Sequence, residues 1–119
     1  MRLISTLAAA ILFLLMSVGP ASAHAILVQS SPAANGTVAG PAVDFELHFN
    51  SRIDAKLSTM TLIRSDKSTT KLAGADDAPA DVLKTKADLT PGDYVLRWQV
   101  LAVDGHITRG DVPFTVSGK

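Results

Sequence analysis

The sequence contains no cysteine and no excess of charge of either sign, and both absences narrow what the protein can be. Its 119 residues include 11 Lys+Arg and 11 Asp+Glu. Without cysteine there is no disulfide framework, no thiolate metal site and no cysteine nucleophile. Without a basic cluster, the attraction to phosphate on which nucleic-acid binding depends is missing. We therefore expect no nucleic-acid partner, and any bound metal must be held by nitrogen, oxygen or methionine sulfur.

Sequence motifs of common enzyme classes are also missing. No serine lies in a nucleophile elbow or an S-x-x-K motif, and there is no glycine-rich phosphate loop. Asp76 and Asp77 are the one close pair of carboxylates, and they lie in a polar stretch, 74–81, that is typical of a solvated surface loop. We therefore expect that the protein is not an enzyme.

The first 23 residues have the composition of a cleavable secretory signal peptide. A positive residue near the start precedes an apolar run over 7–16, and Ala21-Ser22-Ala23 fits the small-x-small rule for cleavage. The apolar run is short for a membrane span and is followed by the helix-breaking pair Gly19-Pro20, which disfavours a retained anchor. We predict a signal peptide over 1–23 and one periplasmic domain over 24–119, with no membrane span in the mature chain.

Cleavage would change both the charge and the first residue of the chain. Removing 23 of 119 residues leaves 96, with ten basic and 11 acidic residues, so the mature net charge is −1. His24 becomes the N-terminal residue, and its α-amine is released from a peptide bond.

The mature sequence carries strand patterns. Apolar and polar residues alternate over 43–49, and the same period of two recurs over 94–103 and 112–116. The far end of the second segment is apolar on both faces, which predicts cover on both sides there. Pro113 cannot donate to a ladder and favours an edge position or a bulge. Shorter β-prone runs occupy 26–29, 58–63 and 82–86.

Turn chemistry separates these runs, as in Asn35-Gly36, Pro91-Gly92-Asp93 and Asp104-Gly105. Six or seven strands in 96 residues predict an all-β fold, a small Greek-key β-sandwich or barrel of immunoglobulin-like size without a disulfide. Met60 and Trp98 lie within β-prone runs and are expected in the core. His48 lies on the polar side of its strand and is expected to be solvated.

Two sequence features suggest metal binding. The α-amine and ring Nδ1 of an N-terminal His24 would close a six-membered chelate, and Asp104-Gly105-His106 offers a carboxylate and an imidazole separated by a flexible glycine. Three nitrogens and one oxygen suit Cu(II), which also heads the divalent affinity order. The competing interpretation is that Asp104-Gly105 is an ordinary hairpin turn with His106 as a polar flank.

The same residues carry a resemblance to a known family. The motifs are His24-Ala25, Ser30-Ser31-Pro32-Ala33, the strand 43–49, Leu89-Thr90-Pro91-Gly92-Asp93-Tyr94-Val95, Trp98-Gln99-Val100 and Val103-Asp104-Gly105-His106. In this combination the mature chain resembles the CopC family of periplasmic copper resistance proteins. The resemblance implies a Greek-key β fold that binds one Cu(II) ion through His24, Asp104 and His106. It also implies a role in copper handling with an inner-membrane CopD-type partner.

Some CopC-like proteins carry a methionine-rich Cu(I) site, but Met60 is the only methionine after residue 23, and one thioether, even with His48, is too few soft ligands. Two further function classes stay open. One is an enzyme similar to the copper monooxygenases that use an N-terminal histidine. The other is a metal-free secreted immunoglobulin-like interaction module.

Overall fold

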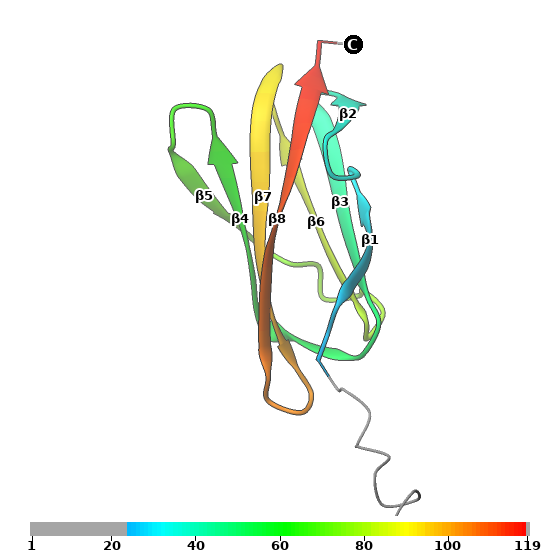
Figure 1. Cartoon of the computed structure of the whole chain (residues 1–119). Helices are drawn as coiled ribbons and strands as arrows, with labels where there is room; N and C mark the ends of the chain where they lie inside the picture. Colours follow the sequence, from blue (N-terminus) through cyan, green and yellow to red (C-terminus); the bar gives the residue numbers. More distant parts are fainter. Residues whose placement is uncertain (1–23, 119) are drawn as a thin grey trace, which may run out of the picture.

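Eight strands make up the fold in the computed structural model, which describes residues 24–118; the predicted signal peptide lies outside the described residues. The strands are β1 (Leu27–Ser31), β2 (Gly36–Ala39), β3 (Ala42–Phe49), β4 (Ile53–Arg64), β5 (Thr69–Leu72), β6 (Val82–Asp88), β7 (Gly92–Ala102) and β8 (Ile107–Ser117). One sheet has the order β1-β3-β6 and the other β2-β8-β7-β4-β5. They pack face to face as a two-layer sandwich (Figure 1). The predicted all-β, Greek-key class without a disulfide is confirmed.

Neighbouring strands pair antiparallel except β2 and β8, which pair parallel. The chain crosses from one sheet to the other five times, at β1–β2, β2–β3, β3–β4, β5–β6 and β6–β7. These crossings bring the N-terminal strand close to segments far along the sequence. Among residues 24–118 there is no helix that could cross a membrane.

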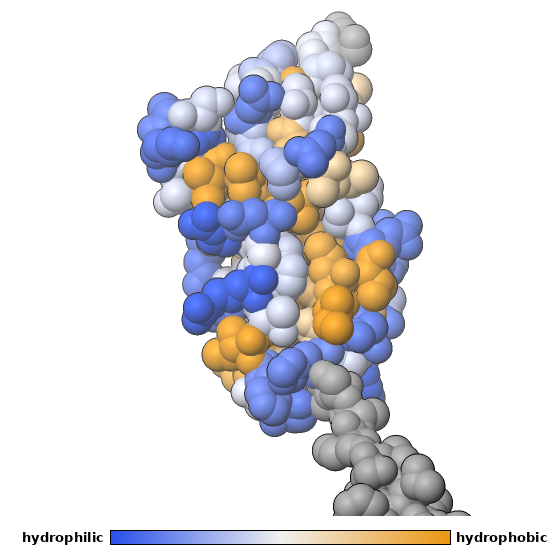
Figure 2. All heavy atoms as spheres, in the orientation of Figure 1, coloured by the Kyte–Doolittle hydropathy of each residue, from blue (hydrophilic) through white to orange (hydrophobic). Residues whose placement is uncertain are grey.

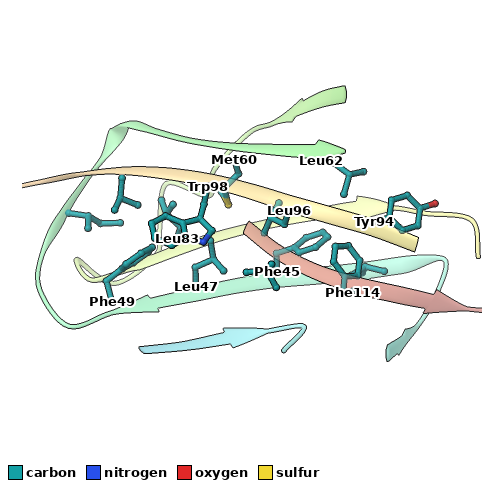
Figure 3. Close-up of a cluster of buried hydrophobic side chains, with 14 of the residues drawn as sticks. Phe45, Leu47, Phe49, Met60, Leu62, Leu83, Tyr94, Leu96, Trp98 and Phe114 are labelled. Carbon is teal, nitrogen blue, oxygen red and sulfur yellow. The ribbon is translucent and has the colours of Figure 1, made fainter. Parts of the chain in front are cut away.

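The core lies between the sheets, where the alternating apolar residues of β3, β7 and β8 meet (Figure 3). The ring of Phe45 packs edge-on against Phe114 at a centroid distance of 5.4 Å, and Phe49 packs in the same manner against Trp98 at 5.3 Å. Met60 is 2% exposed in this core. The predicted core positions of Trp98 and Met60 are confirmed.

Two sequence expectations need correction. Val103 is 69% exposed, because the chain leaves the sheet after Ala102 and no layer covers the hairpin end. β8 is not an edge strand of its sheet, since β2 pairs with it from Phe114 onward. The carbonyl of Pro113 accepts a hydrogen bond from Asn35 N on the β2 side. The missing N–H of Pro113 faces that same side, just before β2 pairing begins.

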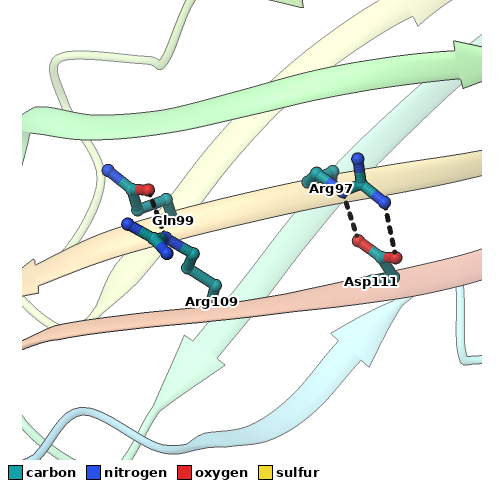
Figure 4. A network of polar contacts seen from close by, with 4 residues as sticks. All are labelled: Arg97, Gln99, Arg109 and Asp111. Carbon is teal, nitrogen blue, oxygen red and sulfur yellow. Dashed lines mark hydrogen bonds and ion pairs between the residues drawn. The ribbon is translucent and has the colours of Figure 1, made fainter.

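The β7–β8 ribbon is also braced on its outer face (Figure 4). The guanidinium of Arg97 forms a two-pronged ion pair with Asp111, with N···O distances of 2.9 and 3.0 Å. Arg109 Nε donates to Gln99 Oε1 at 2.7 Å. The pair with Arg97 holds the pKa of Asp111 below its usual value. These cross-strand contacts hold together the ribbon that ends in the β7–β8 loop.

Candidate metal site

The hairpin between β7 and β8 ends in a three-residue loop whose shape requires glycine. Gly105 N donates to Ala102 O at 2.9 Å, and Ala102 N donates to His106 O at 2.8 Å. Gly105 has a φ of 91°, a left-handed conformation that residues with a Cβ rarely adopt. Such a turn followed by a left-handed residue is a common three-residue hairpin loop. The hairpin-turn interpretation of Asp104-Gly105 is therefore correct as a description of the backbone.

This turn also places the side chains of Asp104 and His106 against each other. Asp104 Oδ1 accepts the backbone N–H of His106 at 3.0 Å, and Asp104 Oδ2 lies 2.8 Å from His106 Nδ1. The side chain of His106 is 62% exposed and that of Asp104 is 26% exposed. The contact engages Nδ1, so Nε2 is the ring nitrogen of His106 that Asp104 does not contact.

The electrostatics of Asp104 follow from these contacts. The backbone N–H and the side chain of His106 lower the pKa of the Asp104 carboxyl below its usual value, and the charges of His106 and His24 add to this effect. Asp104 is therefore an anion wherever the protein is near neutral pH. An ionised carboxylate beside two imidazoles is a suitable environment for a cation.

His24 lies beside His106 although 82 positions separate them in sequence. The centroids of their imidazole rings are 4.4 Å apart and the ring planes are tilted by 58°. Figure 1 shows how this happens: β1 begins at the same end of the sandwich as the β7–β8 loop, opposite the C-terminus. The structure thus brings the three residues predicted as ligands together. Their role as ligands stays a prediction.

The three residues are neighbours, not a closed coordination site. Among residues 24–118, no group of three or more His, Asp or Glu side chains has an arrangement that could hold a metal ion as it stands. The chain also still carries residue 23, so the backbone nitrogen of His24 is an amide that cannot serve as the predicted amine ligand. A carboxylate has about four lone-pair positions, so Asp104 can keep its contact with His106 and still present oxygen to a metal.

Two other residues considered as metal ligands lie elsewhere. His48 points outward from β3, with Nε2 3.3 Å from Glu46 Oε1, and its side chain is 40% exposed. Met60 is buried in the core. His48 faces outward from β3 and Met60 lies in the core, so the two residues do not form a shared pair of metal ligands.

Three exposed apolar residues lie next to the candidate ligands in the sequence. Ile26, Val103 and Ile107 are 52%, 69% and 55% exposed, and each lies one or two positions from a candidate ligand. Figure 2 shows apolar surface in separate patches on a mainly hydrophilic face. We name Ile26, Val103 and Ile107 the apolar rim.

Comparisons with known proteins agree with this fold. Residues 27–117 match the model of the CopC domain family. Copper resistance protein C of Xanthomonas campestris pv. juglandis is 33% identical over 105 residues, which cover 81% of this chain and 82% of that protein.

Solved structures give the same result. The crystal structure of CopC from Methylosinus trichosporium OB3b superposes with a TM-score of 0.72 at 31% identity, over 80% of this chain and 95% of that one. PcoC, a methionine-rich copper resistance protein from Escherichia coli, gives a TM-score of 0.69 at 27% identity, over 80% of this chain and 100% of that one. With a family model that spans nearly all of the described residues and with relatives matched over most of their length, the chain belongs to the CopC domain family.

Proposed function

We propose that the mature protein is a periplasmic copper-binding protein that takes one Cu(II) ion at the end of the sandwich. The ligands would be the α-amine and Nδ1 of His24, a carboxylate oxygen of Asp104 and a ring nitrogen of His106. In this proposal copper is cargo, the protein has no catalytic activity, and its role lies in copper resistance, homeostasis or delivery. The names of the relatives, copper resistance protein C among them, support this role.

One observation carries the proposal. Three residues with the right donor atoms, one at the predicted mature N-terminus and two in a distant hairpin loop, lie together, with 4.4 Å between the imidazole centroids and 2.8 Å between His106 Nδ1 and Asp104. Core packing does not require the three residues to lie together, because none of them is buried. An exposed cluster of two imidazoles and a carboxylate is the donor set that Cu(II) prefers.

Signal-peptide cleavage would complete the site. It converts the backbone nitrogen of His24 from a non-basic amide into an amine, which gives a nitrogen ligand in the same residue as the ring. The three residues that are only neighbours in the full chain would then supply three nitrogens and one oxygen. The hard carboxylate of Asp104 favours Cu(II) over Cu(I), and the buried thioether of Met60 cannot offset that preference.

The apolar rim supports a membrane partner of the CopD type. A partner that contacts Ile26 or Ile107 would lie next to a proposed ligand in the sequence, as transfer of an ion from one protein to another needs.

The decisive experiment compares two forms of the protein that differ at the N-terminus. The mature chain 24–119 and the same chain with one methionine before His24 are titrated with Cu(II) against a competing chelator, and their electron paramagnetic resonance spectra are recorded. We expect one tight site in the mature form and a weaker site with a different spectrum in the extended form. Equal affinity and spectra would mean that the α-amine is not a ligand.

Two histidine variants provide the matched control. His106→Ala should abolish tight binding, whereas His48→Ala removes an exposed histidine on the outer face of β3 and should leave affinity unchanged. Absence of any tight Cu(II) site in the mature parent would favour the metal-free module. Ascorbate-driven oxidation of a glycan by the copper form would instead favour the monooxygenase-like enzyme.

A further inference from the structure

The segment that carries His24 to the site is held by an unusual pair of hydrogen bonds. Asn50 N donates to Ile26 O at 2.9 Å, and Ile26 N donates to the side-chain Oδ1 of Asn50 at 2.8 Å. In a regular antiparallel pair the two residues exchange both bonds through their backbones. Here the chain turns away after β3, and the side-chain carbonyl of Asn50 replaces the backbone carbonyl. The β1–β3 ladder is thereby extended one pair toward the N-terminus.

This extension leaves little freedom between the sheet and His24. The backbone of Ile26 is fixed by its two bonds to Asn50, and Ala25 is completely buried in the core. His24 is therefore attached directly to an anchored residue. The buried Ala25 and the doubly bonded Ile26 restrict the positions open to His24, whose ring centroid lies 4.4 Å from that of His106.

The turn that contains Asn50 is itself tied to the other half of the site. Arg52 O accepts a hydrogen bond from Val103 N at 3.4 Å, next to Asp104. On either side of the turn, Phe49 N donates to Asp81 O at 2.9 Å and Ile53 N donates to Ala80 O at 3.0 Å. The turn over 50–52 is thus the one segment bonded to both the N-terminal arm and the β7–β8 loop among the backbone contacts described.

We propose that Asn50 is a positioning residue of the copper site. Its side-chain carbonyl holds the backbone of Ile26, and this sets the direction of the N-terminal segment so that His24 lies against Asp104 and His106. Asn50 does not contact the metal in this role; it acts through Ile26. The inference rests on the proposed Cu(II) site and adds a determinant outside its ligand set. Preorganisation of this kind raises affinity by reducing the ordering that binding must impose.

The test compares Asn50→Ala with Asn50→Asp in the mature chain. Alanine removes the acceptor for Ile26 N–H, and aspartate keeps a carbonyl-like oxygen in the same place. We expect Asn50→Ala to weaken Cu(II) binding about two- to tenfold, which is the fold-change that corresponds to the net worth of one hydrogen bond. Asn50→Asp should retain the parent's electron paramagnetic resonance spectrum, when measured at high salt to screen the added charge.

Asp66→Ala is the matched control. Asp66 Oδ1 accepts the backbone N–H of Ser68 at 2.9 Å and the Ser68 hydroxyl at 2.6 Å in the exposed β4–β5 hairpin, so alanine removes a side-chain acceptor of a backbone N–H at another place in the fold. It should leave Cu(II) affinity and spectrum unchanged. A comparable loss of affinity in both alanine variants would mean that Asn50 acts through general stability only and would overturn the proposal.

A second measurement needs no copper. Ile26 is half exposed, so its amide should exchange with solvent rapidly unless Asn50 protects it. In metal-free mature protein we expect protection of this amide in the parent, in Asn50→Asp and in Asp66→Ala, and its loss in Asn50→Ala. Unchanged exchange in Asn50→Ala would refute the positioning role whatever the copper result. A protected amide in a parent that binds no Cu(II) would instead refute the proposed function and, with it, any role of Asn50 in metal binding.

Discussion

Gly110→Ala should destabilise the protein, because Gly110 is the place where β8 passes closest to the indole of Trp98. A Cβ at residue 110 would lie 2.5 Å from Trp98 Cζ2, 2.8 Å from Cε2 and 3.0 Å from Nε1. Carbon atoms in contact are separated by about 3.5 to 4.0 Å, so the ring would have to move by about 1 Å. The φ of Gly110 does not lie in the left-handed region, so the expected effect comes from space alone.

The indole has little room to move. Trp98 is 5% exposed and its ring packs edge-on against Phe49. Overpacking a core costs about 1 to 3 kcal/mol, and rigid ring atoms favour the upper half of that range. Replacing glycine in a strand returns about 0.5 to 1 kcal/mol. We expect a net loss of about 1.5 kcal/mol in the free energy of unfolding, which lowers the Tm of a domain this size by about 6 to 12 °C.

Urea unfolding followed by the fluorescence of Trp98, the single tryptophan, measures this loss. Gly74→Ala is the control, because the atom nearest to a Cβ at residue 74 would be Met60 Cε at an ordinary 3.8 Å. The free energy of unfolding of this variant should differ from that of the parent by less than about 0.5 kcal/mol. Trp98→Phe should relieve the clash, so the double variant, followed by circular dichroism, should lose less than the two single losses added together. A Gly110→Ala protein as stable as the parent would refute the steric reasoning.

Three further predictions concern charge and metal. Asp104→Ala should weaken Cu(II) binding and make the bound ion easier to reduce. Asp104→Asn should have a smaller effect, because an amide oxygen can still approach the metal. A redox titration in which Asp104→Ala matches the parent would mean that Asp104 is a turn residue only. Cu(II) affinity, measured by competition with a chelator, should fall as the pH drops from 7 to about 5, since amine and imidazole nitrogens must lose protons to bind. An affinity that does not change over this range would point to a carboxylate-only site. Arg97 lowers the pKa of Asp111 in the folded state, so this carboxylate contributes stability above its unfolded pKa that is lost as the pH falls. Asp111→Asn should therefore be less stable than the parent at pH 7, and the difference in urea midpoint should shrink below about pH 4; a pH-independent difference would contradict the linkage.

The parts of the fold that could be predicted are those in which burial imposes a long alternating pattern. In β3, the apolar positions from Val43 to Phe49 are all buried, because one face of the strand lies on the core and the other on solvent. β2 and β5 were not predicted, since each has only four residues with little burial, and what holds them is pairing with β8 and β4. Pairing of this kind leaves almost no periodic signal in so short a segment.

In the candidate site, too, one part could be predicted from the sequence and another part could not. The contact between Asp104 and His106 could be expected, because a left-handed glycine between them folds both side chains to one side of a local turn. The approach of His24 depends on strand order, which the sequence did not give. The role of Asn50 could not be predicted either, since its partner is a backbone N–H 24 positions away. Asparagine is also favoured in turns that have no such contact.

The geometry of the candidate site depends on how the two sheets are placed relative to each other. His24 precedes β1 in the three-stranded sheet, whereas Asp104 and His106 join β7 and β8 in the five-stranded sheet. The ligands of the proposed copper ion therefore come from both layers, and a relative shift of the sheets would change the distance between the two imidazoles. The β3–β4 turn crosses between the layers and bonds to both halves, through Asn50 on one side and through Arg52 on the other. Substitutions in this turn should therefore alter copper affinity without touching a ligand, whereas substitutions at the opposite end of the sandwich should alter stability alone.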